Sequence, residues 1–195
     1  CMPLGVILRD VLDLAHNLRE AKRMLATRQV LVDGRIETDL GRGVGLMDVL
    51  TVGEDSFRCI LDVNGKLRYR SISDKAAASK LCRVMGKSTI TDGKTQIHLH
   101  DGRNILVSDA KLYDSGDTLV ISLPDQSVAG HHPFSKGATA YLTGGSHIGI
   151  TAKVVSRDIK RSSKPNEVQF PDFGTVADYV FIIGADKDLP LEVKA

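Results

Sequence analysis

Basic side chains that can bind phosphate groups are concentrated in three short segments of this 195-residue chain. The first spans ten residues with Glu20 as its one acid, the second has a cation at every other position, and the third spans twelve residues with Asp158 as its one acid. The three clusters are Arg19, Lys22, Arg23 and Arg28; Lys66, Arg68 and Arg70; and Lys153, Arg157, Lys160, Arg161 and Lys164. Each cluster alone is explained equally well as a solvated face. Three clusters on different parts of the chain favour a polyanionic partner.

Motifs typical of enzymes are incomplete in this sequence. Residues 86–88 (GKS) and 93–95 (GKT) match the end of a nucleotide-binding P-loop, but Leu81 and Ser88 stand where the motif needs its first glycine. His98 and His100 have the spacing of a metal-ligand pair on one strand, without a third ligand at a convincing spacing. No Ser/His/Asp order stands out. We therefore expect no catalytic site, no bound metal, no cofactor and no small-molecule substrate.

Composition is that of a soluble protein with a core, because 42% of the residues are hydrophobic and 26% are charged. The net charge of +2 is too even to identify a partner, and an aromatic content of 5% without Trp argues against a single-strand binder built on base-stacking aromatic platforms, although four Tyr and five Phe leave one possible. No apolar run approaches the roughly 20 residues of a transmembrane helix. Three cysteines without a CxxC spacing argue against a disulfide framework or a zinc ribbon and favour a reducing cytosol.

The elements that must position the first cluster are two helices and a hairpin. Apolar residues at three- and four-residue spacing predict a helix from Leu4 that His16 and Asn17 end. Asn17 can cap a second helix, with Glu20 in the capping-box position, and this helix places Arg19, Lys22 and Arg23 on its outer face. The period then changes to two, and Asp33-Gly34 predicts a type I′ turn between two strands.

The middle of the chain predicts hairpins. Residues 57–73 turn at Asn64-Gly65, which places the second cluster on one face of a strand, and residues 97–106 turn at Asp101-Gly102. That basic face could equally be the solvent side that protects an edge strand. Residues 73–81 predict a short helix, and residues 111–123 predict a strand, a turn and a strand.

The last segment predicts a small β-barrel with a basic loop. Residues 136–155 alternate around the turn Gly144-Gly145 and around Gly149, residues 157–164 form a loop that we expect to be mobile in the free protein, and residues 179–183 form a closing strand.

The order of these elements resembles a known RNA-binding unit. The segments "REAKRML", "VLVDGR" and "GLMDVL" are similar to the alpha-L module of small-subunit ribosomal protein four, some pseudouridine synthases and tyrosyl-tRNA synthetases. The pattern falls on Glu20, Ala21, Val30, Val32, Asp33, Gly34, Gly45 and Asp48. The sequence departs from it at Leu18, where the module has an Arg, and at Arg28, where it has a glycine.

The segment of residues 136–155 resembles the KOW motif, an SH3-like barrel of ribosomal proteins and elongation factors, with Gly149 as its central glycine. Together with "LHDGRN" in the middle, "YVFIIG" at the end and the opening residues 3–10, it makes nearly the whole chain similar to small-subunit ribosomal protein four of the e type, a family of archaea and eukaryotes. Family members begin with a basic extension, whose absence would explain the start at Cys1 and the low net charge. The modest basicity favours an archaeal source.

The resemblance implies an α+β, mostly β protein with an alpha-L module at 1–52, a β-rich domain at 53–129 and a KOW barrel at 130–195. It implies a structural role in translation on the cytoplasmic small ribosomal subunit, with rRNA and neighbouring ribosomal proteins as partners, no membrane contact and a monomeric state off the ribosome. Besides the three clusters, the residues expected to bind RNA are Arg9, Asp33, Gly34, Arg35, Gly144, Gly145, His147 and Gly149.

Two other functions remain open at this point. An RNA-modifying enzyme that carries an alpha-L module would need a catalytic domain of roughly 200 residues, for which this chain has no room. The sequence also leaves open a non-ribosomal RNA-binding regulator or stress protein. Sedimentation with the small subunit would distinguish a ribosomal protein from such a regulator.

Overall fold

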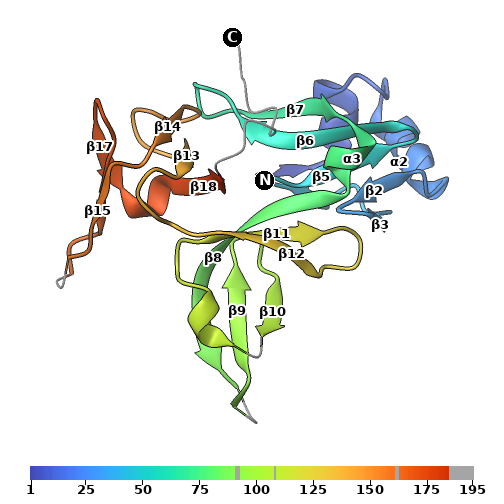
Figure 1. Ribbon diagram of the computed structural model, residues 1–195. Helices are drawn as coiled ribbons and strands as arrows, with labels where there is room; N and C mark the ends of the chain where they lie inside the picture. The colour runs from blue at the N-terminus through green and yellow to red at the C-terminus, as the bar shows by residue number, and fades with distance from the viewer. Residues whose placement is uncertain (91–92, 108, 161–162, 185–195) are drawn as a thin grey trace. The chain divides into compact units, whose positions relative to one another are not determined.

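The fold was analysed in a computed structural model, which describes residues 1–90, 93–107, 109–160 and 163–184 (Figure 1). It is mostly β, with few and short helices, as predicted. Two compact units are present: the first comprises Cys1–Asp62, Lys66–Lys80 and Ile121–Ser127, and the second comprises the other described residues. In the described part of the chain, no helix combines the length and the apolar character needed to cross a membrane.

The first unit combines short helices with an antiparallel five-stranded sheet of order β3-β2-β5-β6-β7. The strands are β2 Val30–Val32, β3 Arg35–Ile36, β5 Val49–Val52, β6 Asp55–Leu61 and β7 Leu67–Ile72, and a separate pair joins β1 Met2–Pro3 to β4 Gly43–Val44. The helices are α1 Leu4–Val6, its π-helical continuation η1 Ile7–Val11, α2 Leu18–Ala26 and α3 Asp74–Ala77. Leu4, Leu8 and Leu25 meet Val30 and Leu50 in a fully buried core. Burial of these apolar side chains fixes the helices on the sheet.

The second unit contains most of a five-stranded sheet of order β10-β9-β8-β11-β12 and two three-stranded sheets. The first sheet consists of β8 Ser79–Thr89, β9 Thr95–Leu99, β10 Asn104–Val107, β11 Thr118–Ser122 and β12 Val128–His132. The others are β14 Thr151–Lys153, β13 Thr139–Leu142 and β18 Val180–Gly184, and β15 Ser156–Asp158, β16 Glu167–Gln169 and β17 Gly174–Val176. The 3-10 turns η3 Ala110–Leu112 and η4 Ala177–Tyr179 complete the unit. Ala140, Leu142, Val168 and Ile182 form its apolar core beneath the two smaller sheets.

The predicted hairpins are confirmed. Asp33 and Gly34 have φ values of +52° and +74°, as a type I′ turn requires. The pairs β6–β7, β9–β10 and β13–β14 are antiparallel neighbours around the predicted turns.

The first predicted helix is shorter than expected, because it ends at Val11 and not at His16. Leu12 closes it with a bond from its N–H to the carbonyl of Ile7, and Asp13 has a φ of +53°. A residue in the left-handed region cannot continue a right-handed helix. The apolar periodicity continues past this point because Ala15 is buried without being helical.

Three further predictions are wrong in detail. The helix expected over 73–81 stops at Ala77, and β8 starts at Ser79 because the side chains that follow are buried in the sheet. The strand expected after residue 111 is a 3-10 turn, in which the Asp109 side chain accepts the N–H of Lys111. The basic loop of residues 157–164 begins as strand β15, which pairs with β16.

The predicted domain boundary after residue 52 falls between β5 and β6, which are paired strands of one sheet in one compact unit. The division into 1–52, 53–129 and 130–195 therefore remains a prediction about sequence modules, and these modules do not coincide with the compact units.

Candidate nucleic-acid interface

Helix α2 presents a row of exposed cations. Arg19, Lys22 and Arg23 lie on its outer face and Arg28 lies just past its end, and all four are exposed. Among the residues that the structure describes, no acid lies within ion-pair distance of any of them. Positive charges without internal partners are available to phosphate groups, which are the main ligands of Lys and Arg in nucleic acids.

The local sequence explains why α2 forms where it does. The Asn17 side chain accepts a hydrogen bond from the N–H of Glu20 at 3.0 Å, and the Glu20 carboxylate accepts the N–H of His16 at 2.8 Å. In a capping box the Glu carboxylate accepts the N–H of the N-cap residue, whereas here Glu20 accepts the N–H of His16, which precedes the cap Asn17. Ala21 and Leu25 are fully buried, so the opposite face has to carry the cations.

The Asp33-Gly34 turn rests on a buried charged group that the sequence does not reveal. Lys80, 1% exposed, places its Nζ 2.9 Å from Asp33 Oδ2 and 2.5 Å from Asp48 Oδ1. Asp33 also accepts the N–H of Val49, and Asp48 accepts the N–H of Gly45. Lys80 lies 32 and 47 residues from its partners, and no local motif marks it. Because the Asp33 side chain is only 3% exposed, it supports the turn and is not part of the exposed surface; Gly34 and Arg35 are exposed.

Of the second cluster, Arg68 and Arg70 lie on β7 and Lys66 lies directly before it. Leu67 and Tyr69 pack against the core, and the alternate residues Lys66 and Arg68 are exposed. Arg68 keeps a 60% exposed side chain while it pairs with Asp62 at 3.2 Å. Arg70 is half-buried. Only part of this stripe is therefore free of internal contacts.

Arg9 is half-buried and already paired. Its guanidinium donates two hydrogen bonds to Asp10, at 2.6 Å and 2.7 Å. The hydrogen bonds to Asp10 raise the pKa of Arg9, so the charge is present but locally balanced. Arg9 is a weaker candidate for phosphate binding than the cations of α2.

The third cluster is divided by the structure. Lys153 and Lys164 are exposed, whereas Arg157 places its guanidinium 4.5 Å from the centre of the Phe134 ring and Lys160 pairs with Glu167. Arg161 lies outside the described residues. Two cations of the expected mobile loop thus have contacts within the protein: Arg157 lies on β15, which pairs with β16, and Lys160 pairs with Glu167 of β16.

The loop between β13 and β14 carries the remaining predicted residues. Gly145 and Gly149 have φ values of +78° and +77°, a region that favours glycine. His147 stacks on Phe173 with 3.9 Å between the ring centres, and Phe173 stacks in turn on Phe170. The fold thus gathers several of the few rings of this chain around one loop.

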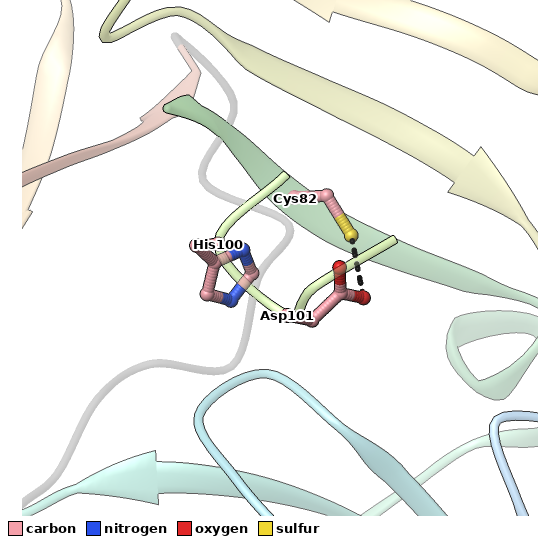
Figure 2. A group of neighbouring side chains, drawn as sticks. All are labelled: Cys82, His100 and Asp101. Atoms are coloured by element: carbon pink, nitrogen blue, oxygen red, sulfur yellow. Dashed lines mark hydrogen bonds between the residues drawn. The ribbon is translucent and has the colours of Figure 1, made fainter. Parts of the chain in front are cut away.

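A possible metal-binding group is explained by contacts within the protein. Figure 2 shows Cys82, His100 and Asp101, whose potential ligand atoms lie within 4.8 Å of one another. The Cys82 thiol lies 3.5 Å from Asp101 Oδ2, Arg103 pairs with the same oxygen at 3.3 Å, and His100 Nδ1 accepts the N–H of Arg83. A cation here would have to compete with the Arg103 guanidinium for the Asp101 carboxylate, which argues against a metal site.

His98 is engaged elsewhere and does not act with His100. Its Nε2 lies 2.9 Å from Ser88 Oγ and its Nδ1 lies 2.7 Å from Asn104 Oδ1. The order of these bonds is that of a Ser-His-Asn triad, but the three residues lie side by side on β8, β9 and β10, with Ser88 and Asn104 exposed. The row ties three neighbouring strands in register.

Comparison with known proteins gives consistent matches. The model of the ribosomal family S4e matches residues 53–128. Small ribosomal subunit protein eS4 of Methanococcus aeolicus is 38% identical over 95% of this chain and 81% of its own length, and that of Methanocaldococcus jannaschii is 37% identical over 96% and 82%. The crystal structure of the 30S ribosomal protein S4e from Thermoplasma acidophilum has a TM-score of 0.84 and 33% identity, and the match covers 95% of each chain.

Proposed function

Because this chain belongs to the ribosomal S4e family, we propose that it is a structural, non-catalytic constituent of the small ribosomal subunit, where it takes part in translation on the cytoplasmic ribosome. Its partners are then the small-subunit rRNA and neighbouring ribosomal proteins. Off the ribosome we expect a monomer.

The observation that carries RNA binding is the row of unpaired cations on α2. Arg19, Lys22 and Arg23 are exposed and have no acidic neighbour within the described residues to neutralise them. Surface charges of one sign attract a polyanion over a Debye length of roughly 8–10 Å. The exposed cations Arg35, Lys66, Lys153 and Lys164 are further candidate phosphate contacts.

The modules inferred from the resemblance are part of the proposal. The alpha-L assignment is supported by α2, by the type I′ turn at Asp33 and by the bond from Gly45 to Asp48. The KOW assignment is supported by the positive φ of Gly149 and by the sheet β14-β13-β18. A central module at 53–129 is supported by the family match at 53–128.

The test is incorporation into the subunit. A tagged copy of the full chain is expressed in a methanogen and the extract is sedimented through a sucrose gradient at low and high salt. We expect the chain to follow the small subunit under both conditions, since an integral constituent resists a salt wash. A chain that binds RNA but stays in the soluble fractions would instead indicate a regulator that acts off the ribosome.

A further inference from the structure

Tyr179, at the end of η4, packs its aromatic ring against the protein and yet remains partly exposed to solvent. The residue is 42% exposed. A Cβ built on Gly144 would lie 2.5 Å from Cδ1 of this ring, and one built on Gly145 would lie 3.5 Å from Cδ2 on its other side. The ring therefore lies close to both glycines, while 42% of the residue stays exposed to solvent. Gly144 is a glycine for this reason, because a methyl group there would displace the ring.

The ring is held in place through its backbone. The carbonyl of Tyr179 accepts the N–H of Thr143 at 2.9 Å and the Thr143 hydroxyl at 3.1 Å. The preceding carbonyl, that of Asp178, accepts a guanidinium N–H from Arg83 at 2.5 Å. In the part of the chain that the structure describes, no group forms a hydrogen bond with the Tyr179 hydroxyl.

This arrangement differs from ordinary packing. A tyrosine that only braced a loop would bury its ring and find a partner for its hydroxyl. Here the ring lies against two glycines and stays 42% exposed, its hydroxyl has no hydrogen-bond partner among the described residues, and the glycine turn lets a second chain approach closely. Such a surface suits a planar group with hydrogen-bonding edges.

We propose that Tyr179 stacks on an unpaired nucleobase of the small-subunit rRNA, an inference that rests on the proposed function. Every base has a π face, so the ring needs no particular sequence, and the hydroxyl can bond a base edge or a 2′-OH. The charge of neighbouring Asp178 is partly balanced by Arg83, whose guanidinium lies 3.8 Å from it. The low aromatic content argues against many such rings, and this site needs only one.

The test separates stacking from phosphate binding. The full chain is titrated with transcribed small-subunit rRNA of Methanocaldococcus jannaschii at several salt concentrations, as wild type, Tyr179→Phe, Tyr179→Leu and the Arg19/Lys22/Arg23→Gln variant. Leucine retains apolar contact with the glycines but has no π face. We expect Tyr179→Leu to weaken binding roughly 5- to 100-fold, as for loss of one stacked base, with an unchanged salt slope. Tyr179→Phe should bind within about threefold of wild type because it keeps the π face.

A second measurement covers the case in which Tyr179→Leu fails to fold. Wild-type protein in assembled small subunits is irradiated with ultraviolet light, and the crosslinked peptides are sequenced. A crosslink between Tyr179 and a nucleotide supports the proposal. A folded Tyr179→Leu protein with wild-type affinity, or a Tyr179 that crosslinks to protein or to nothing, overturns it. If wild type itself shows no salt-dependent binding to the rRNA, the proposed RNA-binding function fails, whereas wild-type affinity of the Arg19/Lys22/Arg23→Gln variant removes only the α2 face from the interface.

Discussion

Lys80 and Asp48 form a buried ion pair in which Nζ lies 2.5 Å from Oδ1, and Asp33, in the turn between β2 and β3, completes the group at 2.9 Å. One ammonium thus forms ion pairs with two carboxylates and joins β8 to the Asp33-Gly34 turn and to the start of β5. Burial raises the pKa of Asp48, while the charge of Lys80 lowers it again and that of Asp33 raises it. The turn next to the basic helix depends on this one lysine.

Replacing Lys80 with Met should destabilise the protein by about 3–5 kcal/mol, because two buried carboxylates lose their counter-charge. The loss should depend on pH. Without Lys80, burial and mutual repulsion raise the pKa of one carboxyl above its unfolded value of about 4. An acid with a raised folded-state pKa destabilises the fold as pH rises from the unfolded to the folded value. Urea unfolding at pH 4 to 7 should therefore show a small deficit at pH 4 and a large one at pH 7.

The matched control adds Asp33→Asn and Asp48→Asn to Lys80→Met, which removes the charges and keeps the shapes. This triple variant should lose the pH dependence. An equal deficit at every pH would mean that the lysine contributes packing and not charge.

Arg28 has a φ of +60°, directly after the C-terminus of α2, where its N–H bonds the carbonyl of Leu25. This left-handed position costs a residue with a Cβ about 1–2 kcal/mol. Glycine also raises the conformational entropy of the unfolded chain, which opposes folding. Arg28→Gly should therefore stabilise the fold by a net amount of about 0.5–1 kcal/mol. The same change should lower the salt slope of rRNA binding by about 0.9, as for one lost phosphate contact.

Arg28→Ala is the control, because it keeps the strained backbone and removes the charge. It should lose the same salt slope without any gain in melting temperature. If Arg28→Gly gains stability and keeps the full slope, Arg28 does not contact phosphate.

Sequence reasoning succeeds here where the cause is local. The cap at Asn17, the turn at Asp33-Gly34 and the alternation along β7 all depend on residues within a few positions of each other. It fails where the cause is distant. Lys80 acquires its role from residues 32 and 47 positions away. Helix α3 ends at Ala77 because the residues of β8 that follow are buried in a sheet whose other strands lie far along the chain.

The candidate surface follows the same division. The exposed cations of α2 and β7 follow from periodicity. The contacts that anchor Arg157 on Phe134 and lay Tyr179 on Gly144 join segments that only the fold brings together. A search of the sequence for charged residues therefore finds Arg157, whose contacts are within the protein, and misses Tyr179, whose exposed ring lies against two glycines.

The row of cations on α2 predicts a specific salt dependence. Changing Arg19, Lys22 and Arg23 to Gln removes about three phosphate contacts, so the slope of log K against log salt should fall by roughly two to three. Helix stability should hardly change, since Gln is nearly as good a helix former. The control changes Lys75, Lys94 and Lys111 to Gln, exposed lysines outside the three clusters, and removes the same net charge. Equal slopes for the two variants would mean that net charge, and not this face, attracts the RNA.

A side chain at Gly149, in the loop between β13 and β14, should lower the stability of the protein. It is buried with a φ of +77°, and its N–H bonds the carbonyl of Leu142. Gly149→Ala should destabilise this part by at least about 1–2 kcal/mol, because the left-handed conformation penalises a Cβ. Amide exchange should then accelerate first in β13 and β14. Gly86→Ala is the matched control: that glycine has open space around its Cβ position and no positive φ, so exchange should stay as in wild type. Wild-type protection of both strands in Gly149→Ala would show that the loop adopts another backbone conformation at no cost.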